Sequence, residues 1–405
     1  MPTETLSITT TAGHKLSGSL ELPTGLTRGA ALFAHCFTCT KQSKAAIAVS
    51  RALAARGIAT LRFDFTGLGG SQGEFGRAGF ATDVSDLVAA AETLMERFGN
   101  KLLLVGHSLG GAAVLAAADD LGFDRIAGVA TIGAPSDVPH ALERIDGDID
   151  AIKADGSGDV KIGGRPFSLS SEFLVKTESA KLLDEVQRLR APILIMHSPT
   201  DAIVGIEHAG QLFQAAKHPK SFISLHGADH LLLEQSDAEF AASVIASWAE
   251  RYLPEPAKRV VPEGTVTVQT GHGKFGTEVH TASHRFVADE PLSYGGDNTG
   301  PTPYDLLLAS LGTCTAMTMK MYADRKKWPL DGVNIELRHE RNHAEDCDHA
   351  TGGDGQHQDI QALYRTISVE GGLTPEQRSK IIEIADKCPV HRTLESHLHI
   401  HTDAK

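Results

Sequence analysis

The sequence predicts two folded parts: a doubly wound α/β sheet with a small cap, followed by a separate α+β unit. First, residues 6–250 alternate apolar strand-like runs with segments of helical 3.6-residue period. This order is typical of a mostly parallel sheet that is covered on both faces. Second, the pattern changes after a proline-rich segment to short strand-like runs and one long apolar helix. A length of 405 residues also suits roughly two or three domains.

The first domain is expected to span residues 1–252. It opens with a predicted hairpin turned at Ala12-Gly13. Strand-like runs follow at 30–37, 58–65, 101–106, 126–132, 192–197 and 221–225. Helical patterns cover 45–56, 79–98, 110–120, 206–216 and 238–252. Residues 135–190 interrupt the alternation with acidic and glycine-rich patches, and we interpret them as a cap inserted over the carboxyl edge of the sheet.

A linker and a second domain follow. Residues 253–264 carry three prolines, which end the last helix and restart the chain in an extended form. The domain predicted for 265–405 begins with three short strands over 265–289. Its long helix, 303–327, is capped by Thr302 and is apolar on almost every face, so we expect it to be buried. The remaining elements are strands near 333–341 and 359–370, a helix over 375–387 and a short strand over 398–401.

Composition excludes several classes of protein. The formal net charge of −13 disfavours nucleic acid and anionic membrane surfaces as partners. No apolar stretch approaches the roughly 18 residues of a membrane-spanning helix, and the N-terminus lacks the regions of a secretory signal. Five cysteines are a low and odd number for a secreted disulfide scaffold, so we expect a reducing cytoplasm.

The segment GHSLG, residues 106–110, follows a buried strand-like run and opens a helix of small residues. This is the G-x-S-x-G nucleophile elbow in the strand–turn–helix context that it requires. The turn projects the Ser108 hydroxyl, and the start of the helix presents the Leu109 N–H to a developing oxyanion. For the second oxyanion donor we expect the N–H of Phe37 or Cys36, on the loop after the first apolar run.

A serine hydroxyl is a weak nucleophile unless a base takes its proton. His230 lies on the loop after the last strand-like run, and Asp201 lies on the loop after the preceding run. The chain order Ser, Asp, His, with each residue just beyond a strand, is the order that this elbow requires. Asp137 is an alternative acid, whereas Asp229 is interpreted as a solvated turn residue.

These motifs resemble the α/β-hydrolase family over residues 6–250. The resemblance implies that Ser108 attacks an ester or amide carbonyl and forms an acyl-enzyme. His230 would take the serine proton and later activate water, and Asp201 would orient the imidazole. The small cap and the absence of an apolar lid favour small, soluble, short-acyl esters as substrates. We expect neither a cofactor nor a metal.

Two cysteines mark the second domain. The segment GPTPYDLLLASLGTC (300–314), the dipeptide Cys388-Pro389 and the β-β-β-helix-β-β-helix order resemble the OsmC/Ohr family over about 265–402. The resemblance implies a thiol-dependent peroxidase and an intertwined homodimer with active sites at the subunit interface. It makes Cys314 the peroxidatic and Cys388 the resolving cysteine. An organic hydroperoxide would oxidise Cys314 to a sulfenic acid, which condenses with Cys388, and an external dithiol would reduce the disulfide.

The peroxide site departs from the family pattern. Its peroxidases carry a Glu in the turn before the long helix and an Arg from an N-terminal strand. Here Tyr304 occupies the position of the Glu. Glu290 could supply a carboxylate instead, and Arg285 is the candidate for the Arg. A buried thiol without a nearby cation is poorly reactive, so two interpretations stay open. The second domain is either a peroxidase or a non-catalytic module for dimerisation or binding.

Two further clusters have plainer interpretations. Cys36 and Cys39 form a C-x-x-C motif, for which tight packing beside the serine is preferred over a redox role. An acidic, glycine-rich excursion gathers four histidines and a cysteine, with the spacing of no standard zinc finger, and we interpret it as a surface loop. Its residues are His339, His343, Cys347, His349 and His357.

The sequence therefore predicts a bifunctional chain. One half is a serine carboxylesterase, and the other is an OsmC-like cysteine-pair domain with organic hydroperoxide reductase activity. The alternative is a single-activity serine hydrolase whose OsmC-like half only dimerises or binds. A catalytically silent receptor is a third interpretation, which the complete triad disfavours.

Overall fold

The computed structural model describes residues 1–36, 39–99, 101–139, 145–162, 165–178, 181–255, 259–343 and 359–404. Contacts between Cα atoms divide the chain into two compact units, Met1–Thr299 and Gly300–Lys405. The three short strands expected over 265–289 fall in the first of these units. Each unit has its own architecture.

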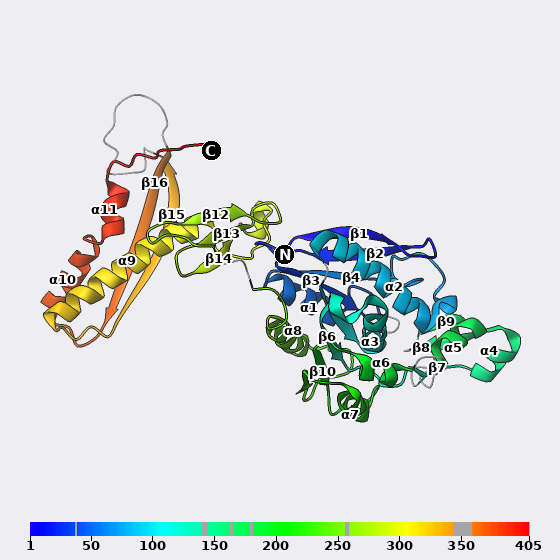
Figure 1. The fold of residues 1–405 in the computed structure, drawn as a ribbon. Helices are drawn as coiled ribbons and strands as arrows, with labels where there is room; N and C mark the ends of the chain where they lie inside the picture. Colours follow the sequence, from blue (N-terminus) through cyan, green and yellow to red (C-terminus); the bar gives the residue numbers. More distant parts are fainter. Residues whose placement is uncertain are drawn as a thin grey trace. The chain divides into compact units, whose positions relative to one another are not determined.

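The first unit is built on an eight-stranded sheet with the order β1-β2-β4-β3-β5-β6-β10-β11 (Figure 1). The predicted N-terminal hairpin is present: β1 (Thr3–Thr9) pairs antiparallel with β2 (Lys15–Glu21). The second strand of the hairpin also pairs antiparallel with β4 (Ile58–Phe63). The other strands are parallel: β3 (Gly29–Ala34), β5 (Leu102–His107), β6 (Ile126–Ile132), β10 (Ile193–His197) and β11 (Lys220–Ser224). The predicted α/β fold is confirmed, and the hairpin makes the sheet mixed.

Helices cover both faces of this sheet (Figure 1). One face packs on α1 (Lys44–Ala54) and α8 (Gln235–Ala249). The other packs on α2 (Phe75–Phe98), α3 (Leu109–Leu121) and α7 (Ile206–Ala215). Neighbouring residues of one strand enter different cores, as Leu32 and Phe33 do. Because side chains alternate along a strand and both faces are buried, these strands lack polar alternation.

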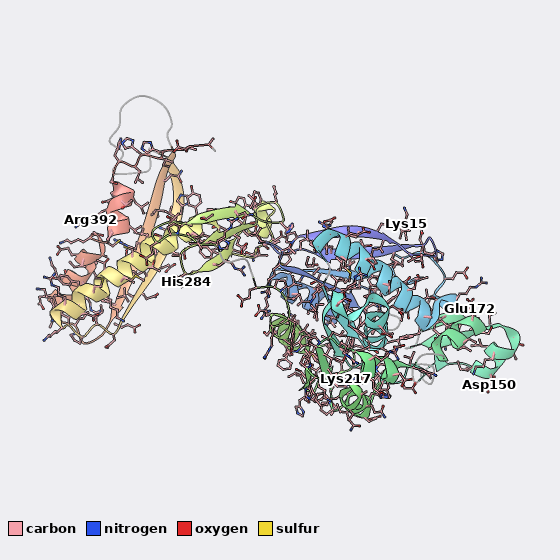
Figure 2. All side chains as sticks on the ribbon, in the orientation of Figure 1. Lys15, Asp150, Glu172, Lys217, His284 and Arg392 are labelled. Carbon is pink, nitrogen blue, oxygen red and sulfur yellow. A yellow bond between two sulfur atoms is a disulfide. The ribbon has the colours of Figure 1, made fainter. Side chains whose placement is uncertain are left out.

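Between β6 and β10 the chain forms the predicted cap. Its described residues form a three-stranded antiparallel sheet and three helices: β7 (Ile145–Asp146), α4 (Ile149–Asp155), β8 (Ser157–Ile162), β9 (Arg165–Ser170), α5 (Ser171–Glu178) and α6 (Leu182–Arg188). In Figure 2, Asp150 and Glu172 mark α4 and α5. The ring of Phe75, at the start of α2, lies 4.9 Å from that of Phe167 and 5.8 Å from that of Phe173. These contacts attach the cap to the main sheet's helices.

A small antiparallel sheet closes the first unit: β12 (Thr267–Thr270), β13 (Thr277–His280) and β14 (Arg285–Ala288). The buried carboxylate of Glu278 accepts the Leu26 N–H at 3.1 Å and pairs with Arg285 at 3.1 Å. Thr27 Oγ1 lies 2.9 Å from His272 Nε2. These contacts join the sheet to the loop between β2 and β3.

The second unit is an α+β structure whose long helix, α9 (Pro303–Lys326), begins where the sequence predicts. Thr302 and Asp305 form a reciprocal capping box, with contacts of 3.1 and 2.9 Å. The strands β15 (Gly332–His343) and β16 (Asp359–Glu370) pair antiparallel, and α10 (Pro375–Ala385) and α11 (Pro389–Glu395) follow. The strand expected at 398–401 was wrong, because these residues pair with no strand in the described part of the chain.

The expectation that α9 is buried all round is also wrong for a single chain. One stripe of the helix, Leu311, Thr315, Met319 and Ala323, is buried, and part of it packs against β16 and α10. Met317 and Met321 are 64% and 72% exposed. The reason is geometric, because two strands and two short helices cover only one side of a helix.

Close packing between α3 and the end of β3 leads to a stability prediction. A Cβ atom added at Gly110 would lie 2.4 Å from the His35 carbonyl oxygen, whereas one added at Gly210, on α7, meets nothing within 4 Å. Gly110→Ala should therefore lower the free energy of unfolding by about 1–3 kcal/mol. Gly210→Ala, the matched helical control, should raise it by about 0.5–1 kcal/mol. Denaturant unfolding of both variants measures this, and equal effects would contradict the packing argument.

Candidate active sites

Ser108 occupies the sharp turn between β5 and α3. Its backbone angles, φ 55° and ψ −126°, lie in a region that non-glycine residues rarely adopt, at a cost of about 1–3 kcal/mol. A Cβ at Gly106 would lie 2.2 Å from the Gly110 carbonyl oxygen, so the turn requires glycine on both sides of the serine. The Ser108 N–H donates to the Ile132 carbonyl at 2.8 Å, which ties the turn to β6.

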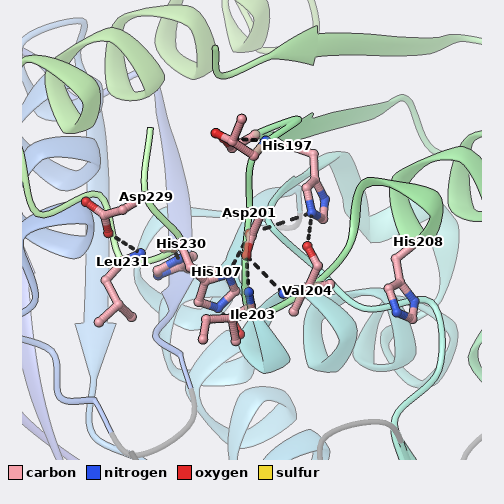
Figure 3. Close-up of polar contacts among 12 residues, drawn as sticks. His107, His197, Asp201, Ile203, Val204, His208, Asp229, His230 and Leu231 are labelled. Carbon is pink, nitrogen blue, oxygen red and sulfur yellow. Dashed lines mark hydrogen bonds and ion pairs between the residues drawn. The ribbon is translucent and has the colours of Figure 1, made fainter. Parts of the chain in front are cut away.

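Three loops bring Ser108, His230 and Asp201 together. His230 Nε2 lies 2.8 Å from Ser108 Oγ, and His230 Nδ1 lies 2.7 Å from Asp201 Oδ2. Asp201 follows β10 and His230 follows β11, which is the placement expected from the sequence. Figure 3 shows the imidazole of His230 and the carboxylate of Asp201 facing each other. The arrangement is a hydrogen-bonded line from carboxylate to hydroxyl.

The carboxylate of Asp201 is held in a fixed orientation. Its Oδ1 accepts the N–H groups of Ile203 at 2.8 Å and Val204 at 2.9 Å (Figure 3). Burial raises the pKa of Asp201, but the hydrogen bonds from His230 and these N–H groups outweigh it, and the pKa lies below its ordinary value. An ionised Asp201 keeps the proton of His230 on Nδ1, which leaves Nε2 free to accept from Ser108.

The other polar residues near the elbow are not part of this line. Asp137 is exposed, and Asp229 accepts the N–H groups of Leu231 and Leu233 at 2.7 and 3.0 Å, as expected for a turn residue. His107 is buried, and its Nε2 donates to the His230 carbonyl at 2.6 Å. Burial and the nearby His230 lower the pKa of His107 to about 4, so it is a neutral packing residue.

The expected oxyanion donors are only partly described. Leu109 begins α3 directly after Ser108, but Phe37 lies outside the described residues. Cys36 is buried, as expected, and lines a narrow slot that also contacts Leu109 and Phe75. Cys36 and Cys39 are joined by a disulfide, which the sequence did not lead us to expect.

In the second unit, Cys314 and Cys388 are neighbours. The Cys314 thiol, on α9, hydrogen-bonds the Cys388 sulfur. Cys388 directly precedes α11, and its sulfur also accepts the His391 N–H at 3.3 Å and the Thr315 hydroxyl at 3.6 Å. Cys388 is completely buried, while Cys314 is partly exposed. Two thiols in contact are able to form a disulfide.

The cation beside this pair is Arg365, which sequence reasoning missed. Arg365 Nη1 donates to Thr315 Oγ1 at 2.8 Å, and Nη2 donates to Asp386 Oδ1 at 2.6 Å. The signal was present in the strand pattern. Alternate residues of β16 face the core, namely Leu363, Arg365, Ile367 and Val369, so a cation stands in an otherwise apolar row.

The three residues expected to support peroxide binding are divided between the two units. Arg285 and Glu290 belong to the first unit, where Arg285 pairs with Glu278 at 3.1 Å. The ring of Tyr304 stacks on His339 with centroids 4.2 Å apart. Tyr304 precedes Cys314 by ten residues, or about 15 Å along the helix, so it does not approach that thiol within one chain.

Two searches of the described residues, for clusters of metal ligands and for membrane-spanning helices, found neither. Within the described ranges, no three or more His, Cys, Asp or Glu side chains are grouped to hold a metal ion. Most of the His/Cys-rich excursion, including Cys347, His349 and His357, lies outside those ranges. None of the helices described here combines the length and the apolar character needed to cross a bilayer.

Comparison with protein families assigns both halves. Residues 29–243, more than half of the chain, match the model of the alpha/beta hydrolase family. The chain belongs to the alpha/beta hydrolase family. Residues 296–403 match the model of OsmC-like proteins, so an OsmC domain follows the hydrolase domain and both resemblances seen in the sequence are confirmed.

Solved structures support the hydrolase assignment. The chain is 46% identical to the esterase domain of a Rhodothermus marinus protein, with 62% of this chain and 99% of that chain covered and a TM-score of 0.52. Est1E from Butyrivibrio proteoclasticus, solved with ferulic acid, is 21% identical, with coverages of 61% and 98% and a TM-score of 0.53. GrgF from Penicillium sp. sh18 is 21% identical, with coverages of 62% and 99% and a TM-score of 0.53. The last two show the fold alone. A search of curated proteins gave no match.

Proposed function

We propose that the chain is a bifunctional enzyme: a serine carboxylesterase fused to a thiol-dependent organic hydroperoxide reductase. The observation that carries the esterase half is the unbroken contact line from Asp201 through His230 to Ser108, at 2.7 and 2.8 Å. The 46% identity to an esterase domain supports the same chemistry. The reductase half is supported by the contact between Cys314 and Cys388 beside a cation.

The esterase mechanism follows from the geometry of the first site. Ser108 Oγ attacks the ester carbonyl while His230 Nε2 takes its proton, and Asp201 stabilises the imidazolium that forms. The Leu109 N–H, with an N–H of the loop after β3, stabilises the oxyanion. The imidazolium then protonates the leaving alcohol. Finally, His230 activates a water molecule that attacks the acyl-enzyme and releases the acid.

The space beside the nucleophile favours short acyl groups. The slot next to Leu109 is lined mainly by apolar side chains, together with His35 and Asp83, and its volume is about 10 Å³. Its aromatic lining is Phe65 and Phe75. This is room for about one water-sized group. A long acyl chain would have to displace the aromatic side chains, so we propose short-acyl esters, such as acetates, as substrates.

The triad assignment predicts the kinetics of three variants. Ser108→Ala should abolish hydrolysis of p-nitrophenyl acetate. Asp201→Asn should lower kcat by about 10³–10⁴-fold with little change in KM. The reason is that an amide no longer holds the His230 proton on Nδ1, so Nε2 is not free to accept the serine proton. Asp137→Asn, which alters an exposed carboxylate on a neighbouring loop, is the control and should match the wild type. Full activity of Ser108→Ala would contradict the assignment.

The second site is proposed to reduce hydroperoxides by a two-electron cycle. The Cys314 sulfur attacks the peroxide oxygen, the O–O bond breaks, and an alcohol leaves. Cys388 then attacks the sulfenic acid, and water leaves as the disulfide forms. An external dithiol reduces the disulfide and restores both thiols. The sum is one hydroperoxide and one dithiol converted to alcohol, water and oxidised dithiol.

Hydroperoxide consumption with a dithiol reductant tests this second activity. Wild type should turn over tert-butyl or cumene hydroperoxide, and Cys314→Ser and Cys388→Ser should each lose turnover. Ser108→Ala is the matched control and should retain it. No wild-type turnover across several hydroperoxides and dithiols would favour the alternative, in which the OsmC-like half is a non-catalytic dimerisation or binding module.

The apolar face that α9 leaves exposed is proposed to bind a second copy of the chain. Met317 and Met321 lie on this face, 64% and 72% exposed, and large exposed apolar surfaces mark interaction sites. Sedimentation should give a dimer for the wild type, and the double variant Met317→Lys, Met321→Lys should be monomeric with its esterase activity intact. A monomeric wild type would contradict this proposal.

A further inference from the structure

The slot beside the nucleophile elbow contains one carboxyl group that the esterase mechanism does not use. Asp83, on α2, lines this slot together with Leu109 and Gly110 at the start of α3 and Cys36 just beyond β3. Leu109 directly follows the proposed nucleophile, and its N–H is one of the expected oxyanion donors. Asp83 therefore lines the space that we propose for the acyl group.

The Asp83 carboxyl has no polar partner within the described part of the chain. It forms no hydrogen bond or ion pair there, and the influences on its ionisation are its burial and the nearby Asp86 carboxyl. Asp86, by contrast, accepts the Thr66 N–H at 2.8 Å. A carboxyl group that is withdrawn from water without a hydrogen-bond partner costs free energy. A polar group that enters the slot and pairs with Asp83 recovers part of this cost.

The other polar side chain of the slot is already paired. His35 Nδ1 donates to the Cys36 carbonyl at 2.8 Å, and His35 Nε2 accepts the Phe65 N–H at 3.4 Å. Burial lowers the pKa of His35 to about 4, so its ring is neutral. The described residues that line the slot include no Lys or Arg. Among these lining side chains, the carboxyl of Asp83 is the group with unused hydrogen-bonding capacity.

Size and charge select the group that fits beside Asp83. The slot has a volume of about 10 Å³, which is room for about one water-sized group. Burial and the Asp86 carboxyl raise the pKa of Asp83 well above its ordinary value, so Asp83 stays neutral to a higher pH than an exposed carboxyl does. A neutral carboxyl offers both a donor and an acceptor, as a hydroxyl does. An ammonium ion would lose its hydration there without gaining a full opposite charge.

We propose that the esterase takes short hydroxyacyl esters and that Asp83 binds the hydroxyl of the acyl group. The inference rests on the proposed esterase activity and names its substrate class. In this scheme the hydroxyl hydrogen-bonds the Asp83 carboxyl while the ester carbonyl lies at Ser108. Asp83 determines specificity through this contact, and it takes no part in the proton transfers of the triad.

Paired esters that differ in this hydroxyl alone test the proposal. Ethyl glycolate is compared with ethyl propionate, and ethyl 3-hydroxypropionate with ethyl butyrate, by kcat/KM from acid release at constant pH. Within each pair a methyl group replaces the hydroxyl, so the size of the acyl group is nearly constant. In at least one pair the wild type should prefer the hydroxyacyl ester, and Asp83→Leu should lower this preference by about tenfold. The intrinsic reactivities of the esters cancel when the two proteins are compared.

Two further variants separate hydrogen bonding from packing and from charge. Asp83→Asn keeps one donor and one acceptor group in the slot, and it should retain most of the preference. Glu96→Gln changes an exposed carboxylate near the other end of α2, and it should match the wild type with every ester. Circular dichroism of each variant shows whether a change in preference accompanies a loss of folding.

Equal preferences in the wild type and Asp83→Leu for both pairs would overturn the inference. A wild-type preference for ethyl glycinate over ethyl glycolate would also overturn it, because it would show that the slot binds an ammonium group. In both cases hydrolysis of the propionate ester leaves the proposed esterase function intact. A wild type that hydrolyses none of these esters, and no p-nitrophenyl acetate, fails as an esterase, and the inference then fails with it.

Discussion

The backbone turn at Ser108 is the constraint on which the rest of the hydrolase unit depends. A φ of 55° at a serine persists only where surrounding structure holds it. Here Ile132 accepts the serine N–H, and two glycines allow α3 to touch β5 and β3. The same contact therefore sets the position of Ser108, the start of α3 and the end of β3. His230 and Asp201 complete a site whose position this turn has already fixed.

The two units differ in how fully their helices and strands are covered. In the hydrolase unit, strands buried on both faces position three loops, and all three side chains meet within one chain. In the OsmC-like unit, a two-stranded sheet covers only one stripe of α9. Thr315 and Arg365 lie beside the cysteine pair there, and the other side of the helix leaves Met317 and Met321 exposed.

Sequence reasoning predicted the strands that are buried on both faces, and it was less successful for elements that are buried on one side only. The parallel strands were predicted because both of their faces are apolar. Ser108, Asp201 and His230 were chosen because each follows such a strand, and their catalytic roles stay a prediction. The hairpin β8–β9 was missed, since its segment is rich in Asp and Gly, and α11 was missed because seven residues give no periodicity. The burial of α9 was misjudged. A helix that is apolar on nearly every face is expected to be covered, but the sequence does not show what covers each face. Arg365 was missed because its inward orientation becomes apparent only when the alternation of side chains along β16 is known.

That one chain carries two independent active sites is tested most directly by blocking one of them chemically. A fluorophosphonate should label Ser108 at one equivalent per chain and abolish ester hydrolysis, because the hydrogen-bonded serine is the activated nucleophile. Hydroperoxide reduction by the labelled protein should remain at the wild-type rate. Loss of both activities on labelling, or modification of a residue other than Ser108, would contradict the account.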